Sequence, residues 1–324
     1  MRARLAAVSV DLDEIPEHLA IHGLGAVGDA DAAGHAVYDR ALGRIEAWAD
    51  ALAIPVTFFA IGRDLARPSN AAAVRRLAAR GHAIESHSLS HRYDLSRLAP
   101  DEIAREVEGG LRAVEAATGA RPTGFRAPGY TVSEALFDAL EEAGVAFDSS
   151  VFPSPVYWAA KASVLAWMRA RGRLSASILD APAVLAAPRR PYRPGVPYHR
   201  PAAAMGRARR FVELPILVTP VVGFPVIGTS VGRAGRLGAR ALARVCGGSP
   251  LVNLELHGMD FVDAADLVAP GGPPHPLARL QPELRAPLAA RVENLTAFVE
   301  ALRGRDPGLG FVTLAEAARS FTTG

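Results

Sequence analysis

Short apolar runs rich in β-branched and aromatic residues recur along the chain, and helical patterns separate them. Regular alternation of strand and helix favours a parallel sheet, because parallel neighbours must be joined by a crossover. Seven or eight such units fit a barrel better than a short open sheet. We therefore expect an α/β fold, a distorted (β/α) barrel of about seven strands. The expected strands are Leu5–Val10, Val56–Ala60, Ala83–Ser86, Gly124–Arg126, Val145–Asp148, Ser177–Asp180, Phe211–Pro215, Leu251–Leu256 and Gly310–Thr313.

The helical patterns between these runs begin and end at residues typical of helix termini. Ser133 precedes one pattern as a cap, and Gly81, Gly119 and Gly144 follow others as stop signals. The expected helices are Tyr38–Leu52, Asn70–Ala79, Pro100–Thr118, Ser133–Ala143, Arg233–Val245 and Pro282–Leu302.

Two stretches interrupt the alternation. Phe152–Pro201 is rich in proline and has no clear period, and Met259–Pro282 is a loop rich in proline and glycine. We interpret both as insertions on the rim of one domain, not as linkers between two. The prediction is a single catalytic domain over residues 1–324, with an irregular Pro- and Arg-rich insertion at residues 152–210.

Composition narrows the class of protein. Half of the 324 residues are hydrophobic and 21% are charged, which allows a large core and argues against disorder. The 36 basic and 33 acidic residues are mostly interleaved, so we expect no nucleic-acid partner. The densest basic stretch is Arg189–Arg210. We interpret it first as a solvated loop, with contact to an anionic substrate or a membrane surface as the alternative.

The single cysteine, Cys246, excludes a disulfide framework within the chain and a cysteine-based zinc site. The first residues become charged too quickly for a signal peptide, and no charge-free apolar stretch is long enough to span a membrane. We therefore expect a cytoplasmic protein, with a peripheral contact to the inner membrane surface left open.

Polar residues that suit chemistry follow several of the expected strands. Asp11 and Asp13 end the first strand and share one of its faces, because strand side chains alternate. Two carboxylates there need a cation or a basic group between them. The alternative is a cluster of helix caps and turn residues.

His87 and His91 follow the third expected strand in the segment HSLSH. Their spacing predicts that both imidazoles lie on one side of a helical turn, close enough to share a metal. A lone histidine is more often an ordinary polar residue than a ligand. With Asp13, however, the pair offers two nitrogens and one oxygen and leaves positions open for water and substrate, as a hydrolytic metal requires.

Two further strand ends complete the candidate site. Arg126, in RAPGY, would pair with the carboxylate that does not bind metal, and the N–H groups of its turn would face a developing oxyanion. The alternative is a structural turn with a surface arginine. His257, in LELHG, suits a general acid, and Leu254 and Leu256 would line a pocket for the acyl methyl group.

The segments SVDLDE, HSLSH, RAPGY and LELHG, in this order, resemble the motifs of the polysaccharide deacetylase family, the NodB-homology fold of carbohydrate esterases. The resemblance spans about residues 5–150 and 250–320. It implies a distorted barrel and a divalent metal, zinc in the first place, with cobalt, nickel or iron as alternatives. The implied roles are Asp11 as base, Asp13, His87 and His91 as metal ligands, Arg126 as the tether of Asp11, His257 as general acid, and Tyr130 and Leu256 as substrate or oxyanion contacts.

The chain departs from the family pattern at two points. Many members have adjacent aspartates where Leu12 separates Asp11 from Asp13, and the turn carries Gly129 before Tyr130. The second departure concerns which backbone N–H would face the oxyanion and how Tyr130 is placed.

The resemblance implies a metal-dependent hydrolase that removes an N-acyl group, above all N-acetyl, from an amino sugar or glycan conjugate, a carbon–nitrogen bond other than a peptide bond. A cytoplasmic setting favours an N-acylated or lipid-linked sugar over mature cell-wall polymer. One alternative is a small-molecule amidohydrolase on the same fold, a deformylase or cyclic imide hydrolase. Another is a non-catalytic carbohydrate-binding relative, against which the presence of all six functional positions argues.

Overall fold

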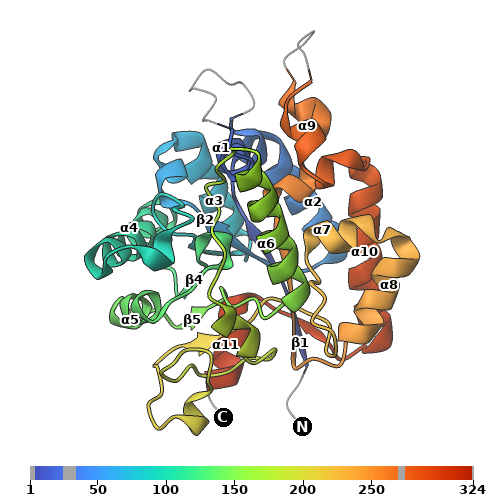
Figure 1. Cartoon of the computed structure of the whole chain (residues 1–324). Coiled ribbons are helices and arrows are strands. Elements are labelled where there is room, and N and C mark those ends of the chain that lie inside the picture. The colour runs from blue at the N-terminus through green and yellow to red at the C-terminus, as the bar shows by residue number, and fades with distance from the viewer. Residues whose placement is uncertain (1–3, 25–33, 269–273, 323–324) are drawn as a thin grey trace.

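The computed structural model describes residues 4–24, 34–268 and 274–322. A curled parallel sheet lies at the centre with helices around it (Figure 1). Its strands follow the order β6-β5-β4-β3-β2-β1-β7, and β8 pairs with β1 off this path. The strands are β1 (Leu5–Asp11), β2 (Val56–Ala60), β3 (Ala83–Ser86), β4 (Gly124–Phe125), β5 (Phe147–Asp148), β6 (Val212–Glu213), β7 (Leu251–His257) and β8 (Gly310–Phe311).

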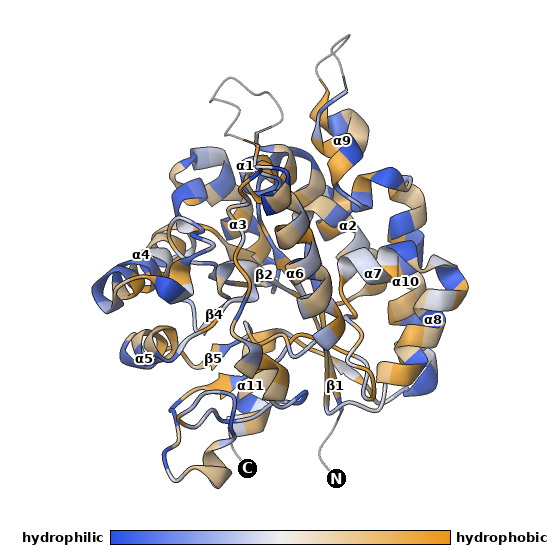
Figure 2. Ribbon diagram, in the orientation of Figure 1, coloured by the Kyte–Doolittle hydropathy of each residue, from blue (hydrophilic) through white to orange (hydrophobic). Residues whose placement is uncertain are grey.

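The helices pack outside the sheet, and the outer faces of α4 and α8 are hydrophilic (Figure 2). None of the described helices is both long enough and apolar enough to cross a membrane. The helices are α1 (Ile15–Ile21), α2 (Leu42–Leu52), α3 (Pro68–Ala79), α4 (Pro100–Thr118), α5 (Glu134–Glu142), α6 (Pro155–Ala170), α7 (Gly228–Arg233), α8 (Gly235–Cys246), α9 (Leu277–Leu280), α10 (Leu288–Arg305) and α11 (Leu314–Thr322).

The sheet forms a distorted barrel. Within the described residues, β6 and β7 at the two ends of the path share no ladder. The chain after β6 reaches β7 instead: the Leu217 N–H donates to the Asn253 carbonyl over 3.2 Å, and Ile227 forms an isolated bridge with Glu255. The predicted distorted (β/α) barrel of about seven strands is confirmed.

Side-chain alternation on the central strands separates the core from the site. Val10 of β1 and Leu256 of β7 are fully buried in the main hydrophobic cluster. Asp11 pairs in register with His257, and Ser9 with Glu255. Because neighbouring strands in register present the same face, these polar residues lie together on the opposite side from Val10 and Leu256.

The segment 152–210 was predicted to be irregular, but it contains the 16-residue helix α6. The helix begins after Ser154, whose hydroxyl accepts from the Tyr157 N–H. Met168 is its one buried residue. A helix without a buried apolar stripe lacks the period that identifies helices in a sequence.

The strand predicted at Ser177–Asp180 is wrong, since these residues form an extended strap without a strand partner in the described chain. The Asp180 carboxylate accepts from the Val132 and Ala181 N–H groups, so side-chain contacts replace a ladder. Of the predicted loop Met259–Pro282, residues 269–273 lie outside the described residues, and the remainder includes α9.

Candidate active site

Three of the predicted residues meet around one point. Asp13 follows β1, while His87 and His91 follow β3. His87 Nε2 lies 3.2 Å from Asp13 Oδ1, and His91 Nε2 lies 3.3 Å from Asp13 Oδ2. One ligand atom from each residue lies within 4.8 Å of the others. A single cation between them could bind all three.

The donor atoms fit a divalent cation. Asp13 Oδ1 and His91 Nε2 are buried and have no hydrogen-bond partner among the described residues, which would be costly without a ligand. His87 Nδ1 lies 2.7 Å from the Arg126 carbonyl oxygen. A carbonyl only accepts, so this nitrogen carries the proton and leaves the Nε2 lone pair for a metal.

Charge within this group acts on the aspartate. Burial alone would raise the pKa of Asp13, but the charges and hydrogen bonds of His91 and His87 outweigh it and hold that pKa well below its usual value. Asp13 is therefore ionised and ready to bind a cation at neutral pH.

The histidine segment is a loop, so the predicted helical turn is wrong. Ser88 and His91 adopt left-handed φ values of 66° and 56°, and the Ser88 hydroxyl accepts from the His91 N–H over 3.0 Å. These two left-handed residues turn the backbone so that both imidazoles point at Asp13. Gly110 of α4 packs against the loop, where an added Cβ would lie 2.5 Å from the Ser86 hydroxyl. The close approach of α4 therefore requires glycine.

Arg126 lies against Asp11, as the resemblance implied. Its Nη1 donates to Asp11 Oδ1 over 2.7 Å, and its other donors bind the Ser9 hydroxyl and the Ser149 carbonyl. The guanidinium also stacks on the Phe59 ring at 4.2 Å. Asp11 Oδ2 is left without a hydrogen-bond partner in the described chain. Arg126 thus fixes one carboxylate oxygen and leaves the other free to accept a proton.

His257 sits between an acidic and a phenolic partner. Its Nδ1 lies 3.0 Å from Glu255 Oε1, and its Nε2 lies 3.2 Å from the Tyr130 hydroxyl. Burial would lower the pKa of His257, but Glu255, then Asp13 and Asp11, hold it well above its usual value. The imidazole is therefore kept protonated, as a general acid requires.

The predicted acyl pocket at Leu256 is wrong. Leu256 and Leu254 point away from Glu255 and His257, because adjacent residues of β7 face opposite sides. Both leucines are buried in the main core. Neither is part of the cavity wall.

A cavity of about 830 Å³ opens over these groups. Its walls include the candidate ligands Asp13 and His87, together with Asp11, Tyr130 and His257. This volume lies towards the upper end for small-molecule sites, which span roughly 300–1,000 Å³. The side of the cavity formed by α6 carries Ala160, Lys161, Ser163, Val164, Leu165, Trp167 and Met168.

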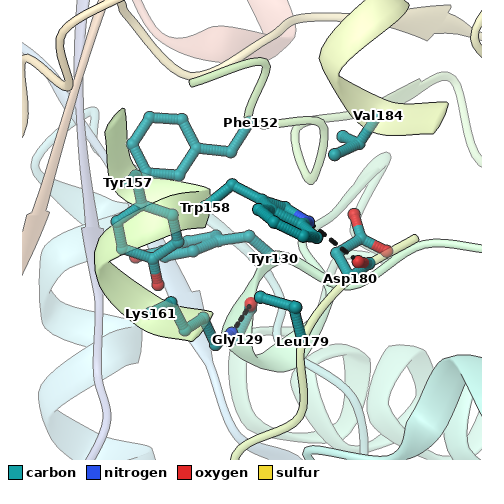
Figure 3. Close-up of a pocket in the computed structure, with 9 residues that line it drawn as sticks. All are labelled: Gly129, Tyr130, Phe152, Tyr157, Trp158, Lys161, Leu179, Asp180 and Val184. Atoms are coloured by element: carbon teal, nitrogen blue, oxygen red, sulfur yellow. Dashed lines mark hydrogen bonds between the residues drawn. The ribbon is translucent and has the colours of Figure 1, made fainter. Parts of the chain in front are cut away.

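Lys161 connects α6 to the turn that carries Tyr130. Figure 3 shows its amine directed at Gly129, whose carbonyl accepts over 3.1 Å. Burial lowers the pKa of Lys161 to about 8, although Asp180 opposes the shift. One turn earlier on the same helix, Trp158 Nε1 donates to the Asp180 carbonyl over 3.0 Å. These two contacts hold α6 at the edge of the cavity.

Sequence reasoning missed several residues of the site. Glu255 lies two positions before His257 on the same strand face, so the alternation rule could have identified it. His18 lines the cavity from α1, and its ring lies 6.0 Å from that of His257. Tyr93 packs edge-on against His91 at 4.7 Å. No sequence signal marked His18 or Tyr93, because neither α1 nor the bend after His91 was predicted.

Fold and site together define a NodB-like (β/α) barrel with a candidate metal site at the carboxyl ends of its strands. Residues 44–147 match the sequence model of the polysaccharide deacetylase family, so the resemblance seen in the motifs is confirmed. The matched region holds His87, His91 and Arg126, whereas Asp11, Asp13 and His257 lie outside it. A search of curated proteins finds no match.

Three solved structures share the fold over nearly the whole chain. The PuuE allantoinase has a TM-score of 0.59 at 17% identity, covering 99% of this chain and 91% of its own. A protein described as a polysaccharide deacetylase from Pseudomonas aeruginosa PAO1 has a TM-score of 0.58 at 18% identity, covering 99% of this chain and 92% of its own. A second protein described as a polysaccharide deacetylase, from Mycobacterium smegmatis, has a TM-score of 0.57 at 17% identity, covering 98% of this chain and 90% of its own. At such identities the likeness concerns the fold alone.

Proposed function

We propose that the protein is a metal-dependent hydrolase that removes an N-acyl group, above all N-acetyl, from an amino sugar or a glycan conjugate. The observation that carries the proposal is the convergence of Asp13, His87 and His91 on one point. Two of these residues, Asp13 and His87, line one cavity together with Asp11 and His257. A bound divalent cation would polarise the acyl carbonyl and make a nearby water more acidic. Zinc suits two nitrogens and one oxygen, and cobalt, nickel and iron are accepted by the same ligand set.

The protein's own groups supply the proton transfers. Asp11 accepts a proton from the attacking water at Oδ2, because Arg126 occupies Oδ1. His257 gives its Nε2 proton to the departing nitrogen as the carbon–nitrogen bond breaks, and the Glu255 carboxylate keeps the imidazole charged and oriented. The Tyr130 hydroxyl lies beside the same nitrogen and is placed to contact the leaving group.

The choice of substrate rests on the cavity. Its volume suits an N-acylated sugar carried on a further group, such as a lipid-linked sugar, better than a small cyclic amide. The second candidate is a small-molecule amidohydrolase using the same residues, an activity that the name of the PuuE allantoinase gives for a protein of this fold. Cytoplasmic localisation stays a prediction.

Product analysis on metal-free and reconstituted protein tests the proposal. Protein stripped with a chelator and reloaded with zinc, cobalt, nickel or iron is incubated with N-acetyl amino sugars, N-formyl amino sugars and cyclic imides. We expect acetate and free amine from the N-acetyl sugars, only in the presence of metal. Formate or a ring-opened acid as the main product would support the second candidate. Equal activity in the stripped protein would contradict metal dependence. Stoichiometric metal without any turnover would indicate a binding protein.

A further inference from the structure

We propose that α6 and the neighbouring loop form a surface that docks onto an anionic lipid bilayer. This docking face consists of apolar side chains that are between 37% and 87% exposed. Contiguous exposed apolar residues of this kind mark interaction sites, because single scattered ones are the norm elsewhere. Its members are Val156, Val164, Trp167, Leu174, Val221, Val222 and Phe224.

Contacts at both ends of α6 make the docking face continuous. At the start of the helix, the Ser154 hydroxyl donates to the Gly223 carbonyl over 2.7 Å. A Cβ on Gly223 would lie 2.7 Å from Pro155 Cδ, so the loop with Val221 and Val222 presses on the first turn of α6. At the other end, the backbone of Leu174 lies against Gly23, beyond the last turn of the helix.

Folding does not explain the apolar character of α6. A surface helix normally buries one apolar stripe, yet Met168 is the single buried residue here. Figure 2 shows α6 crossing the front of the molecule mostly in pale and orange colours, whereas the outer faces of α4 and α8 are largely blue. Trp167 is 51% exposed, although tryptophan side chains are on average largely buried.

Charge identifies the partner as anionic. The segment from Pro155 to Leu179 contains no aspartate or glutamate. Its four basic residues form no ion pair with any residue of the described ranges: Lys161, Arg169, Arg171 and Arg173.

The Pro-rich basic stretch gives the contrasting case. Arg209 pairs with Glu134 and Asp138 of α5 at 2.7 and 2.6 Å, and Arg207 and Arg210 lie near Glu141. The positive charge at this end of the Arg189–Arg210 stretch is therefore compensated within the fold. The charges of Arg169, Arg171 and Arg173, at the end of α6 and directly after it, are left for a partner, whereas Lys161 is held by the Gly129 carbonyl.

The pairing of tryptophan and arginine favours a bilayer over a protein partner. The Arg171 guanidinium stacks on the Trp167 ring at 4.3 Å. Indole rings and long basic side chains are enriched at membrane interfaces, where the ring lies at headgroup depth and the cation meets lipid phosphates. Val164, Trp167 and Met168 also line the cavity. A lipid-linked sugar would therefore reach the cavity from the bilayer, a consequence that rests on the proposed function, whereas the docking does not.

Vesicle binding by the full chain tests the proposal. We expect sedimentation with phosphatidylcholine vesicles that contain phosphatidylglycerol, little with phosphatidylcholine alone, and release by salt. Arg169→Gln/Arg171→Gln should lower the partition coefficient about 30-fold, since each basic residue near an anionic surface is worth about a factor of five. The matched control, Arg233→Gln/Arg244→Gln on α7 and α8, should bind as the unaltered protein does.

A second pair of variants tests the apolar part. Trp167→Glu should abolish binding, while Leu237→Glu, at a residue of α8 that is 81% exposed, should not. Circular dichroism verifies that both remain folded. Brominated lipid should quench the emission of the unaltered protein far more than that of Trp167→Phe, because Trp48 is only 5% exposed and the half-buried Trp158 ring is held at the Asp180 carbonyl.

Three outcomes would overturn the proposal. Absence of binding to anionic vesicles is the first, and equal loss in the control variants on α7 and α8 is the second, because it would indicate a general charge effect. The third is a concentration-dependent dimer in sedimentation velocity that Trp167→Glu disrupts without any vesicle binding, which would assign the docking face to a second copy of the chain.

Discussion

The guanidinium of Arg126 donates to a carboxylate oxygen of Asp11 over 2.7 Å, although 115 residues separate the two in sequence. The pair is fully buried, and Ser9, Ser149 and the Phe59 ring hold the arginine in place. A buried ion pair of this kind fixes the orientation of its two side chains but adds little to stability, because the cost of desolvation offsets the attraction. Here it leaves one aspartate oxygen facing the candidate metal site.

We expect Asp11→Asn to lower kcat by about 10²- to 10⁴-fold, because the amide cannot accept the proton of the attacking water. Metal content should stay unchanged, since Asp13, His87 and His91 provide the ligands. Steady-state rates and elemental analysis of the same preparation measure both. Asp50→Asn, at an exposed residue paired with Arg80, is the control. Activity retained in Asp11→Asn would refute its role as base.

His91→Ala should lose the bound metal, because two ligands hold a cation far less tightly than three. Equilibrium dialysis against zinc compares it with His35→Ala, a change at an exposed histidine outside the cluster. Stoichiometric zinc in the His91 variant would show that the ligand set is different.

Glu255→Gln should move the alkaline limit of kcat/KM to lower pH. The Glu255 carboxylate is the main charge that keeps the pKa of His257 raised against the effect of burial. Without it the imidazole loses its proton at a lower pH, and the acid form that the reaction needs disappears earlier. The pH profile and an NMR titration of His257 measure the shift. An alkaline limit that does not move would assign the acid to another group.

Leu256→Ala should destabilise the protein by about 2–5 kcal/mol, the usual cost of a cavity in a core. KM should not change, because Leu256 lies on the core side of β7. Ile227→Ala makes the contrast, since Ile227 lines the cavity and its loss should alter KM. A large KM effect at Leu256 would restore the acyl pocket that the sequence suggested.

Glu85 makes stability fall with rising pH. Burial raises its pKa from 4.5 to about 7, although the Gly124 and Thr123 N–H groups oppose the shift. The folded state therefore holds a proton that the unfolded chain releases, so this contribution is complete below pH 4.5 and is lost as pH rises through 7. Its size is about 3 kcal/mol by the usual conversion. Urea unfolding of Glu85→Gln should show a flatter pH dependence over this range, and an unchanged slope would contradict the assignment.

Periodicity and strand ends carried most of the sequence prediction. The positions of β1, β2, β3 and β7 follow from short apolar runs, and in a parallel barrel their carboxyl ends meet. That rule alone brought Asp11, Arg126 and His257 into one site. The same alternation, applied to β7, would also have placed Leu256 in the core and Glu255 beside His257.

Other features have no local signal. The loop of His87 and His91 depends on left-handed residues other than glycine, which sequence patterns do not mark. Helix α6 lacks an amphipathic period because its apolar residues face solvent and the cavity. The strap at Ser177–Asp180 is apolar enough for a strand but is held by side-chain contacts. Each of these is decided by tertiary contacts.

Helix α6 is attached to the barrel by few interactions, among them Lys161 with Gly129, Trp158 with Asp180, and the burial of Met168. The folding of the sheet and the placement of the candidate ligands depend on other parts of the chain. Mutations on α6 therefore carry little folding cost, and they change the wall that an incoming substrate meets. Substitutions in this one helix can therefore change which substrate is accepted during evolution, while the catalytic residues at the strand ends stay the same.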